Sequence, residues 1–194
     1  MTKLYWPAAG RNKAVIADAL ATLMPDAQVF LEIASGSGEH IAHFAARWPT
    51  VRFLPTDLDQ EHLASIDAWC AARENVERAT RLDVAEPWPH LSHSVDVVFC
   101  ANMIHIAPWQ ACEGLFAGAR QLGAPNLITY GPYLRNDTQT AASNLRFDAS
   151  LKNRDARWGI RRLDAVEELA QRYGFALDRV VEMPANNLTV FWRA

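Results

Sequence analysis

The sequence predicts an α/β fold, in which a doubly wound, mostly parallel sheet of seven strands has helices on both faces. Two observations lead to this prediction. From residue 27 to residue 132, short apolar runs alternate with segments of helical periodicity, a pattern typical of parallel βαβ units. After residue 160, one more helical segment precedes two apolar runs joined by a short turn, which indicates an antiparallel pair at the C-terminal end.

The first half of the chain contains two strand–helix units after an initial helix. Ile16, Leu20 and Leu23 recur at helical spacing, which predicts a helix over residues 11–24. An apolar run that ends at small residues then predicts a strand. The helix after it stops before Pro49, because the residue before a proline disfavours the helical conformation. A second strand and helix repeat the pattern, so that these four elements are residues 27–34, 39–49, 50–57 and 60–73.

The second half continues the alternation of strands and helices and then ends in a helix and two adjacent strands. A strand, a β-branched strand, a helix and a fifth strand are expected at residues 76–84, 94–104, 109–122 and 126–132. Residues 163–175 form the last helix, which stops at Gly174. The closing strands are "LDRVVEMP" and "NLTVFWRA", and they are joined through Pro184, Ala185 and Asn186.

Residues 133–160 lie between the fifth strand and the last helix and are polar and weakly periodic. Long loops in compact domains are often functional. We therefore predict a single domain over residues 1–194, in which residues 133–160 form a lid or substrate loop.

Composition excludes several classes of function. The net charge is about −3, so no basic field would attract nucleic acid or an anionic membrane. No run approaches the ~18 apolar residues of a membrane span. The three cysteines (Cys70, Cys100 and Cys112) and the histidines match no metal-ligand spacing. Buried free cysteines favour a reducing compartment, which we take to be the cytoplasm. The sequence does not indicate an oligomeric state, and we assign no metal.

The stretch "FLEIASGSGEH" (residues 30–40) is the most informative part of the chain. Its glycines lie where the first strand turns into a helix, and ligands of open α/β sheets bind at such carboxyl ends. A dinucleotide fold would place a pyrophosphate there. Glu32 and Glu39 put negative charge on either side of the loop, and Ile41 occupies the third glycine position of G-x-G-x-x-G. These three features oppose a phosphate ligand.

A cationic ligand removes this difficulty. S-adenosylmethionine carries a sulfonium and an ammonium group and has no phosphate. Asp57 ends the second strand about 20 residues after the loop, where a carboxylate can hold ribose hydroxyls in either cofactor class. Asp59 competes for this role, and either aspartate would alternatively cap the helix that begins near Gln60. Asp83 follows the third strand, where it would contact an adenine edge or make a turn, and Val84 would then offer its backbone N–H to the same ring.

Four segments in the same order resemble the class I SAM-dependent methyltransferases: "EIASGSG", "PTDLD" (55–59), "RLDVAEPWP" (81–89) and "VDVVFCANMIHIAP" (95–108). The resemblance covers most of the chain and implies a Rossmann-like fold with S-adenosyl-L-methionine as cofactor. The family's first motif is E/D-x-G-x-G-x-G, and Ala34 replaces its first glycine, which preserves the turn if φ stays negative. The implied cofactor-binding residues are Glu32, Ala34, Gly36, Gly38, Asp57, Leu58, Asp83, Val84 and Asn102.

A narrower resemblance lies mostly outside the cofactor motifs. The segments "PAAGRNK" (7–13), "YGPY" (130–133), "SNLRFDASLKNRDARWGIR" (143–161) and "MPANN" (183–187) are similar to a small methyltransferase-like family of bacteria and eukaryotes with poorly defined substrates. This similarity implies a shared acceptor pocket. Arg11 and Asn12 would either be a solvated helix terminus or fold back over the site and hold the cofactor's carboxylate. The similarity favours the second role.

Two groups of residues are candidates for catalysis and for acceptor binding. Asn102 and His105 follow the fourth strand, beside the expected methyl donor. A histidine with a pKa near ~6.5 would remove a proton from the acceptor, or His105 would instead order its loop by hydrogen bonding. Aromatic walls and guanidinium donors would suit a small aromatic or carboxylate acceptor, and the candidates are Tyr130, Tyr133, Asn144, Arg154, Trp158 and Arg161.

We therefore predict SAM-dependent methyl transfer to a small-molecule acceptor, without nucleic-acid or membrane partners. The accepting atom is left open among O, N, S and C. Two alternatives remain: a nicotinamide-dependent oxidoreductase on a related fold, and a non-catalytic binding protein that keeps the cofactor fold.

Overall fold

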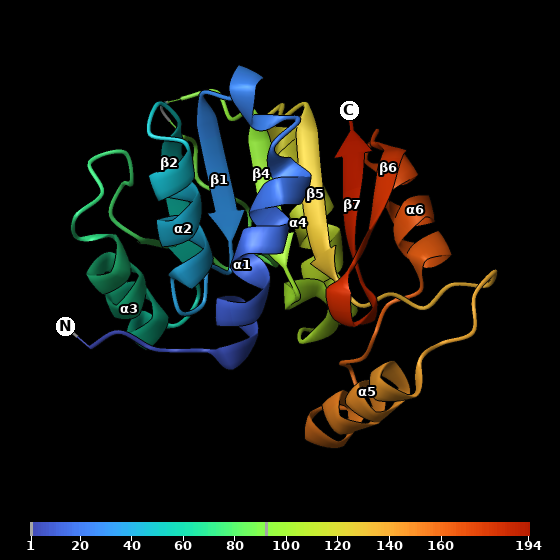
Figure 1. The fold of residues 1–194 in the computed structure, drawn as a ribbon. Coiled ribbons are helices and arrows are strands. Elements are labelled where there is room, and N and C mark those ends of the chain that lie inside the picture. Colours follow the sequence, from blue (N-terminus) through green and yellow to red (C-terminus); the bar gives the residue numbers. More distant parts are fainter. Residues whose placement is uncertain (1, 92) are drawn as a thin grey trace.

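The computed structural model describes residues 2–91 and 93–194, and it contains a seven-stranded sheet of order β3-β2-β1-β4-β5-β7-β6 (Figure 1). The strands β1 to β5 run parallel, and β7 is antiparallel to both β5 and β6. The predicted fold class is therefore confirmed. The strands are β1 (Val29–Ile33), β2 (Arg52–Asp57), β3 (Thr80–Arg81), β4 (Val97–Ala101), β5 (Asn126–Gly131), β6 (Ala176–Met183) and β7 (Asn187–Arg193).

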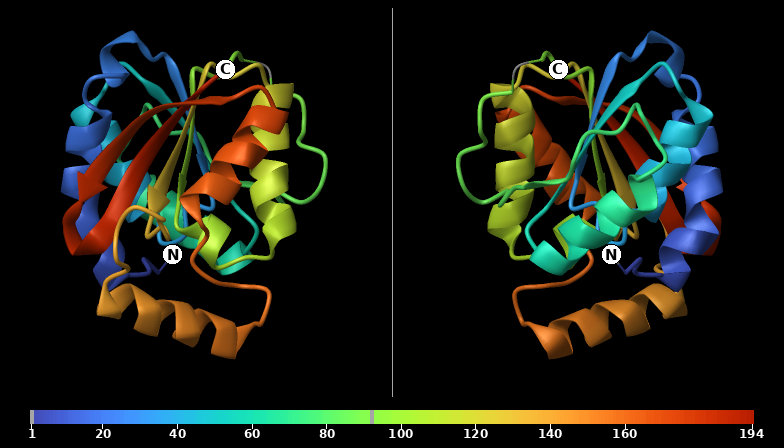
Figure 2. Two further views of the ribbon diagram at one scale, coloured as in Figure 1. Left: turned by 90° about the vertical axis from the view of Figure 1, so that its right-hand side faces the viewer. Right: turned by 90° about the vertical axis from the view of Figure 1, so that its left-hand side faces the viewer.

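Helices cover both faces of the sheet (Figure 2). One hydrophobic cluster joins the sheet to α1, α2 and α3, and a second joins it to α4 and α6. Successive residues of a strand alternate between the clusters: Phe99 packs in the first and Cys100 in the second, as the twofold period of a strand requires. The helices are α1 (Pro7–Leu20), α2 (Glu39–Arg47), α3 (Gln60–Cys70), α4 (Trp109–Gln121), α5 (Ala142–Arg154) and α6 (Leu163–Arg172).

Strand order reverses at β1, which lies between β2 and β4. The connections from β1 to β2 and from β3 to β4 therefore leave in opposite directions, and their loops part above the carboxyl end of β1. A crevice outside this switch point is where open α/β sheets bind ligands. Topology alone thus places the loop after β1 at the centre of the candidate site.

Two predicted strands are shorter than expected. Of residues 76–84, only Thr80 and Arg81 form β3, and the N–H of Ala79 bonds to the Asp67 carboxylate of α3 at 2.8 Å instead of joining a ladder. The strand predicted over 94–104 ends at Ala101, because Asn102 adopts a left-handed conformation (φ 63°) and starts a short 3₁₀ helix.

The segment 133–160 is not a simple loop, since α5 occupies its middle. The expectation of a loop was therefore wrong, and the role as a lid or substrate segment stays a prediction. The sequence did not indicate the helix because α5 buries only Asn144 and Leu151 and leaves Leu145 and Phe147 exposed. A helix with so little buried surface shows no clear apolar period in the sequence. α5 crosses below the carboxyl ends of the strands, apart from the two layers that pack on the sheet (Figure 2).

The turn after β1 also differs from expectation. Ala34 has a φ of 54°, and not the negative φ that we expected of an alanine at this position. The N–H of Ser35 donates to the Thr56 carbonyl at 2.8 Å, and the N–H of Gly36 donates to Asp57 Oδ2 at 2.8 Å. These bonds hold the turn in a shape that costs an alanine about 1–2 kcal/mol. Such strain is typical of functional loops.

In the described part of the chain, no helix has the length and apolar character that a membrane span requires. The same residues contain no group of three or more His, Cys, Asp or Glu side chains arranged to hold a metal ion.

Candidate functional site

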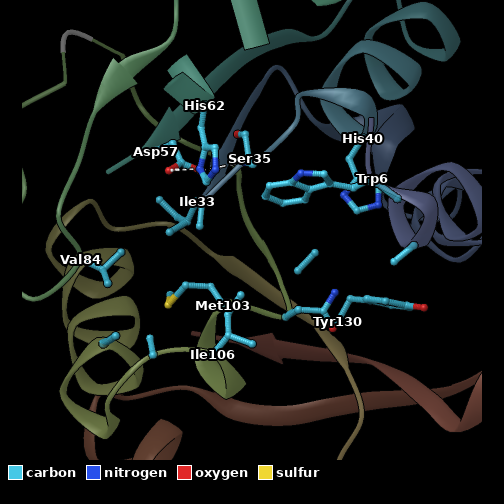
Figure 3. Close-up of a pocket in the computed structure, with 18 of the residues that line it drawn as sticks. Trp6, Ile33, Ser35, His40, Asp57, His62, Val84, Met103, Ile106 and Tyr130 are labelled. Carbon is cyan, nitrogen blue, oxygen red and sulfur yellow. Dashed lines mark hydrogen bonds and ion pairs between the residues drawn. The ribbon is translucent and has the colours of Figure 1, made fainter. Parts of the chain in front are cut away.

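A cavity of about 860 Å³ opens at the carboxyl ends of the parallel strands (Figure 3). This volume lies in the upper part of the range, about 300–1,000 Å³, that is typical of small-molecule sites. We call one side the strand-end wall, which consists of Ile33, Ala34, Ser35, Gly36, Ser37, Asp57, Leu58, Leu82, Asp83 and Val84. We call the lining residues of the 103–111 segment and of α5 the helix wall, which consists of Met103, Ile106, Ala107, Pro108, Gln110, Ala111, Ser143, Asn144 and Phe147.

The Asp57 carboxylate organises the strand-end wall. Its Oδ2 accepts the N–H of Gly36 at 2.8 Å, and its Oδ1 accepts the N–H of Asp59 and the Nδ1–H of His62, each at 3.0 Å. The group therefore ties the glycine loop to the start of α3 while it still lines the cavity. A carboxylate has about four acceptor sites, so capacity is left for a ligand hydroxyl.

Asp59 has a different position. Its side chain accepts the N–H of Glu61 at 2.7 Å and so caps α3, and it is exposed and outside the cavity lining. The geometry thus gives Asp57 the ligand-facing position and Asp59 the capping position. Asp83 accepts the N–H of Ala85 in a turn at 3.0 Å and also lines the cavity, so the contact with an adenine edge stays a prediction.

Glu32 lies behind the glycine loop and is 1% exposed. Its Oε1 is 4.0 Å from His40 Nδ1, and its Oε2 has no hydrogen-bond partner among the described residues. Burial, which outweighs the opposing effect of Ser35, raises the pKa of Glu32 to about 8, with a smaller contribution from the charge of Asp57. A cation bound next to the loop would offset this desolvation.

A chain of polar side chains runs from Glu32 towards the cavity. His40 Nε2 lies 2.7 Å from Asn12 Oδ1, so this nitrogen carries the proton and Nδ1 presents its lone pair to Glu32. Asn12 also lies near Tyr130, where it lowers the pKa of the phenol against the larger, raising effect of burial. Burial, together with the Lys13 charge, lowers the pKa of His40 to about 4. Both Asn12 and Tyr130 line the cavity, and their roles as cofactor and acceptor contacts stay predictions.

Trp6 is a cavity residue that sequence reasoning missed. Its N–H donates to Glu39 Oε1 at 2.9 Å, and its ring meets the His62 ring edge-on at a centroid distance of 5.1 Å. The ring lies so close to Gly36 that a Cβ there would be 2.3 Å from it. Figure 3 shows the indole extending into the cavity. The sequence around Trp6 did not indicate this position, because a tryptophan just before a helix can have many roles.

His105 lies outside the cavity and is fully buried. Its Nδ1 accepts the N–H of Arg161 at 3.1 Å, so the proton is on Nε2, which has no partner in the described part of the chain. Burial and the Arg161 charge lower its pKa to about 3. Tyr133 packs edge-on against the ring and bonds to Thr129 Oγ1 at 2.7 Å. This geometry fits a His105 that orders its loop by hydrogen bonding better than a His105 that removes a proton from the acceptor.

The remaining predicted residues divide into two groups. Ala34, Gly36, Leu58, Val84, Asn102 and Asn144 line the cavity. Arg11, Gly38, Tyr133, Arg154, Trp158 and Arg161 do not line it. Arg154 stacks over Trp158 at 4.9 Å on the surface, and Gly38 packs against Ile66, whose Cα would lie 2.7 Å from an added Cβ. No sequence pattern indicated the apolar helix wall, since its residues look like ordinary core positions.

Acid should destabilise the protein through its buried histidines. The folded-state pKa values of His40 (about 4) and His105 (about 3) lie below the unfolded value of 6.5. The unfolded chain therefore binds more protons below pH 6.5, and the free energy of unfolding falls as the pH drops from 6.5 towards 3. Each histidine should contribute about 1.4 kcal/mol per pH unit over most of that window. Urea unfolding at pH 7, 6 and 5 measures the effect.

The variant His105→Asn isolates one histidine, because an asparagine oxygen replaces Nδ1 as acceptor but does not titrate. Glu32 acts in the opposite direction: its raised pKa adds stability that is lost as the pH rises from 4.5 to about 8. Both proteins contain Glu32, so its contribution cancels when the free energy of unfolding of the variant is subtracted from that of the wild type. An identical pH dependence in the two proteins would contradict the assignment of a neutral, buried His105.

The family described as "Protein of unknown function (DUF938)" matches residues 3–194 of the chain. Among solved structures, the chain is similar to human N-acetylserotonin methyltransferase in complex with SAM, with a TM-score of 0.80 and 13% identity over 96% of this chain and 52% of that one. An O-methyltransferase family protein from Burkholderia thailandensis has a TM-score of 0.80 and 16% identity, over 96% of this chain and 57% of that one.

A third similar structure is an O-methyltransferase family 2 protein from Planctomyces limnophilus in complex with apigenin. Its TM-score is 0.73 at 16% identity, over 94% of this chain and 61% of that one. The chain thus spans about half to three fifths of the length of these proteins. At such identities the similarity establishes the fold, which is that of the class I SAM-dependent methyltransferases.

Proposed function

The chain belongs to the protein family of unknown function DUF938, and we propose that it transfers a methyl group from S-adenosyl-L-methionine to a small-molecule acceptor. One observation carries this proposal. Among the described residues, no lysine or arginine side chain lines the cavity, whereas the Asp57 and Asp83 carboxylates do. Such a site suits a ligand with cationic centres and no phosphate.

The residues present fit this cofactor. Asp57 would accept hydrogen bonds from the ribose hydroxyls, and the Asp83–Val84 turn would meet the adenine. The loop from Ala34 to Ser37 would hold the methionine part, with its ammonium group towards the unpartnered carboxylate oxygen of Glu32. Asn12 and Asn102 line the same region and would hydrogen bond to the methionine carboxylate or ammonium group.

The cofactor supplies an electrophilic methyl group on a sulfonium, and the protein would supply orientation. The acceptor would bind between the helix wall and the cofactor, so that its nucleophilic atom faces the methyl carbon. Holding two reactants in near-attack geometry accounts for much of the rate enhancement in such reactions. The three cysteines are free and buried, which supports a reducing compartment such as the cytoplasm.

The nicotinamide alternative is disfavoured by the same observation. A pyrophosphate would lie at the glycine loop, beside the buried Glu32 and Glu39, and in the described chain no lysine or arginine lines the cavity to balance it. The non-catalytic alternative is separated from the enzyme only by measured turnover, since fold does not fix function.

Thermal unfolding with each cofactor tests the proposal. S-adenosylhomocysteine at 100 times its dissociation constant should add about 2.7 kcal/mol to the free energy of unfolding, and NADH should add nothing. Stabilisation by NADH alone would overturn the assignment.

We further propose that α5 is the lid of this site. Phe147 lines the cavity but is 40% exposed, and Asn144 anchors α5 through a 3.0 Å bond to the Asn186 carbonyl in the β6–β7 turn. Ala185 and Asn186 in that turn have φ values of 60° and 58°, so the docking point is strained. A weakly packed helix on a strained turn is suited to opening and closing.

The lid should be detectable by hydrogen exchange. Amides of α5 should exchange quickly in the empty protein and more slowly once both ligands are bound. Phe147→Ala should reduce methyl transfer and leave the affinity for S-adenosylhomocysteine nearly unchanged, whereas Arg154→Ala, on the surface side, should change neither. Equal protection in the empty and liganded states would mean that α5 is a fixed element.

A further inference from the structure

The helix wall of the cavity has no formal charge. Its side chains are Met103, Ile106, Ala107, Pro108, Gln110, Ala111, Ser143, Asn144 and Phe147. One of its polar side chains already has a hydrogen-bond partner, since Asn144 Nδ2 donates to the Asn186 carbonyl at 3.0 Å. At the rim, Ile106 and Phe147 add exposed apolar surface. In Figure 3, Met103 and Ile106 face Asp57 and His62 across the cavity. A ligand on this wall would therefore be neutral and mostly apolar.

The guanidinium groups of the neighbouring segment do not alter this conclusion. Arg161 Nε donates to the Ile104 carbonyl at 2.8 Å, and its Nη2 donates to the Ala107 carbonyl at 2.6 Å. Arg157 is paired with Asp155 at 2.7 Å, and Arg154 stacks over Trp158. These arginines stabilise the 104–107 and 155–161 segments from outside the cavity. A carboxylate acceptor would have no cationic partner on the helix wall as the structure describes it.

The histidines near the cavity are not placed to act as a base on this wall. His105 is buried behind it, with Nδ1 accepting from Arg161. His40 directs its free nitrogen at Glu32, 4.0 Å away. His62 bonds to Asp57 and lies on the opposite side of the cavity, beside the strand-end wall. Tyr130 is no substitute, since burial raises its pKa.

We infer that the methyl acceptor is a thiol whose remaining part is apolar and uncharged, and this inference rests on the proposed function. An alcohol or phenol (pKa about 10 for tyrosine) would need a base, and an aliphatic amine would be a cation at pH 7 without a carboxylate on the helix wall. A thiol is already partly ionised at pH 7, and its thiolate is intrinsically a strong nucleophile. Its apolar part would lie on the helix wall, and the sulfonium charge of the cofactor would offset the desolvation of the thiolate.

The reaction balances without a further reactant. The thiol loses its proton to solvent, and the thiolate sulfur then attacks the methyl carbon. A new carbon–sulfur bond forms as the bond between the methyl group and the sulfonium breaks, and the electron pair of the broken bond stays on the departing sulfur. The products are a methyl thioether and S-adenosylhomocysteine.

A matched set of acceptors tests the inference with the full-length protein. The kcat/KM for thiophenol should exceed that for phenol by at least about 100-fold, since a missing general base typically costs about 10²–10⁴. It should exceed that for 4-mercaptobenzoate by about tenfold or more, because the helix wall has no partner for the carboxylate. Faster methylation of phenol or of the carboxylate would overturn the inference.

The pH profile supplies a readout that a hidden base would change. With thiophenol and phenylmethanethiol, which differ in pKa, the inflection of kcat/KM should move with the thiol. An inflection at the same pH for both would belong to a protein group and would overturn the inference. Failure to methylate either thiol in a protein that binds S-adenosylhomocysteine would also overturn it, whereas absence of that binding would remove the proposed function itself.

A charge on the helix wall gives a final check. Ile106→Asp should lower kcat/KM for thiophenol by about tenfold or more, because a carboxylate would repel the thiolate, and should leave S-adenosylhomocysteine affinity unchanged. Ala72→Asp, an exposed position outside the cavity, adds the same charge and should leave the kinetics unchanged. Equal kinetics in the two variants would place the acceptor elsewhere.

Discussion

Replacing Gly36 with valine should abolish binding of S-adenosylhomocysteine. Gly36 has a φ of 59° and lines the cavity, and an added Cβ would lie 2.3 Å from the Trp6 ring. A β-branched residue would resist this backbone conformation and fill space that the ligand needs. A penalty above about 3 kcal/mol corresponds to a loss of more than about 100-fold in affinity. Titration calorimetry measures the affinity. If the valine variant does not fold, Gly36→Ala takes its place, because it adds a Cβ at the same position with less strain.

Gly123 offers a matched control for backbone strain. Its φ is 68°, but an added Cβ would meet nothing within 4 Å, and the residue is outside the cavity lining. Gly123→Val should therefore lower stability through strain and leave cofactor affinity intact. If the two variants lost affinity equally, the effect at Gly36 would reflect general destabilisation, and the loop would not be the binding element.

Removing the Asp57 carboxylate should weaken both binding and folding. Asp57→Ala deletes the group that would accept the ribose hydroxyls, which we expect to weaken S-adenosylhomocysteine binding by about 1.5–3 kcal/mol. It also leaves the N–H groups of Gly36 and Asp59 without their acceptors. The free energy of unfolding should then fall by about 1–3 kcal/mol. From the sequence alone, only the first effect would be expected.

Asp59→Ala is the control for this substitution. It removes the cap of α3, which accepts the Glu61 N–H, and should lower stability by about 1 kcal/mol without a change in affinity. Calorimetry and urea unfolding on both variants give the comparison. A loss of affinity in Asp59→Ala, with Asp57→Ala unaffected, would exchange the two roles.

The parts of the molecule that follow from local patterns were predictable. Alternating apolar runs indicated the strands, the helices and the parallel sheet that they form, and Gly36 with Asp57 at the next strand end indicated residues that line the cavity. Chain periodicity and turn chemistry act over a few residues, so one sequence is enough to read them.

Features set by distant contacts were not predictable. Trp6 reaches Gly36 through a backbone bond to Glu39, 33 residues away, and no local pattern specifies that contact. α5 is held by the bond from Asn144 to the Asn186 carbonyl. Because α5 buries so few residues, its sequence has no clear helical period of apolar residues. Ala34 keeps a positive φ because Ser35 and Gly36 are held by the neighbouring β2 strand and its terminal aspartate.

Transfer of a labelled methyl group tests the central claim most directly. The protein is incubated with methyl-labelled S-adenosylmethionine and, in turn, with thiophenol, phenol and aniline, and label and S-adenosylhomocysteine are quantified. We predict labelled methylated product in at least one mixture, an equal amount of S-adenosylhomocysteine, and the loss of both with Gly36→Val. If a protein that binds S-adenosylhomocysteine transferred no label to any acceptor, the claim of methyl transfer would be contradicted in favour of a cofactor-binding protein without this activity.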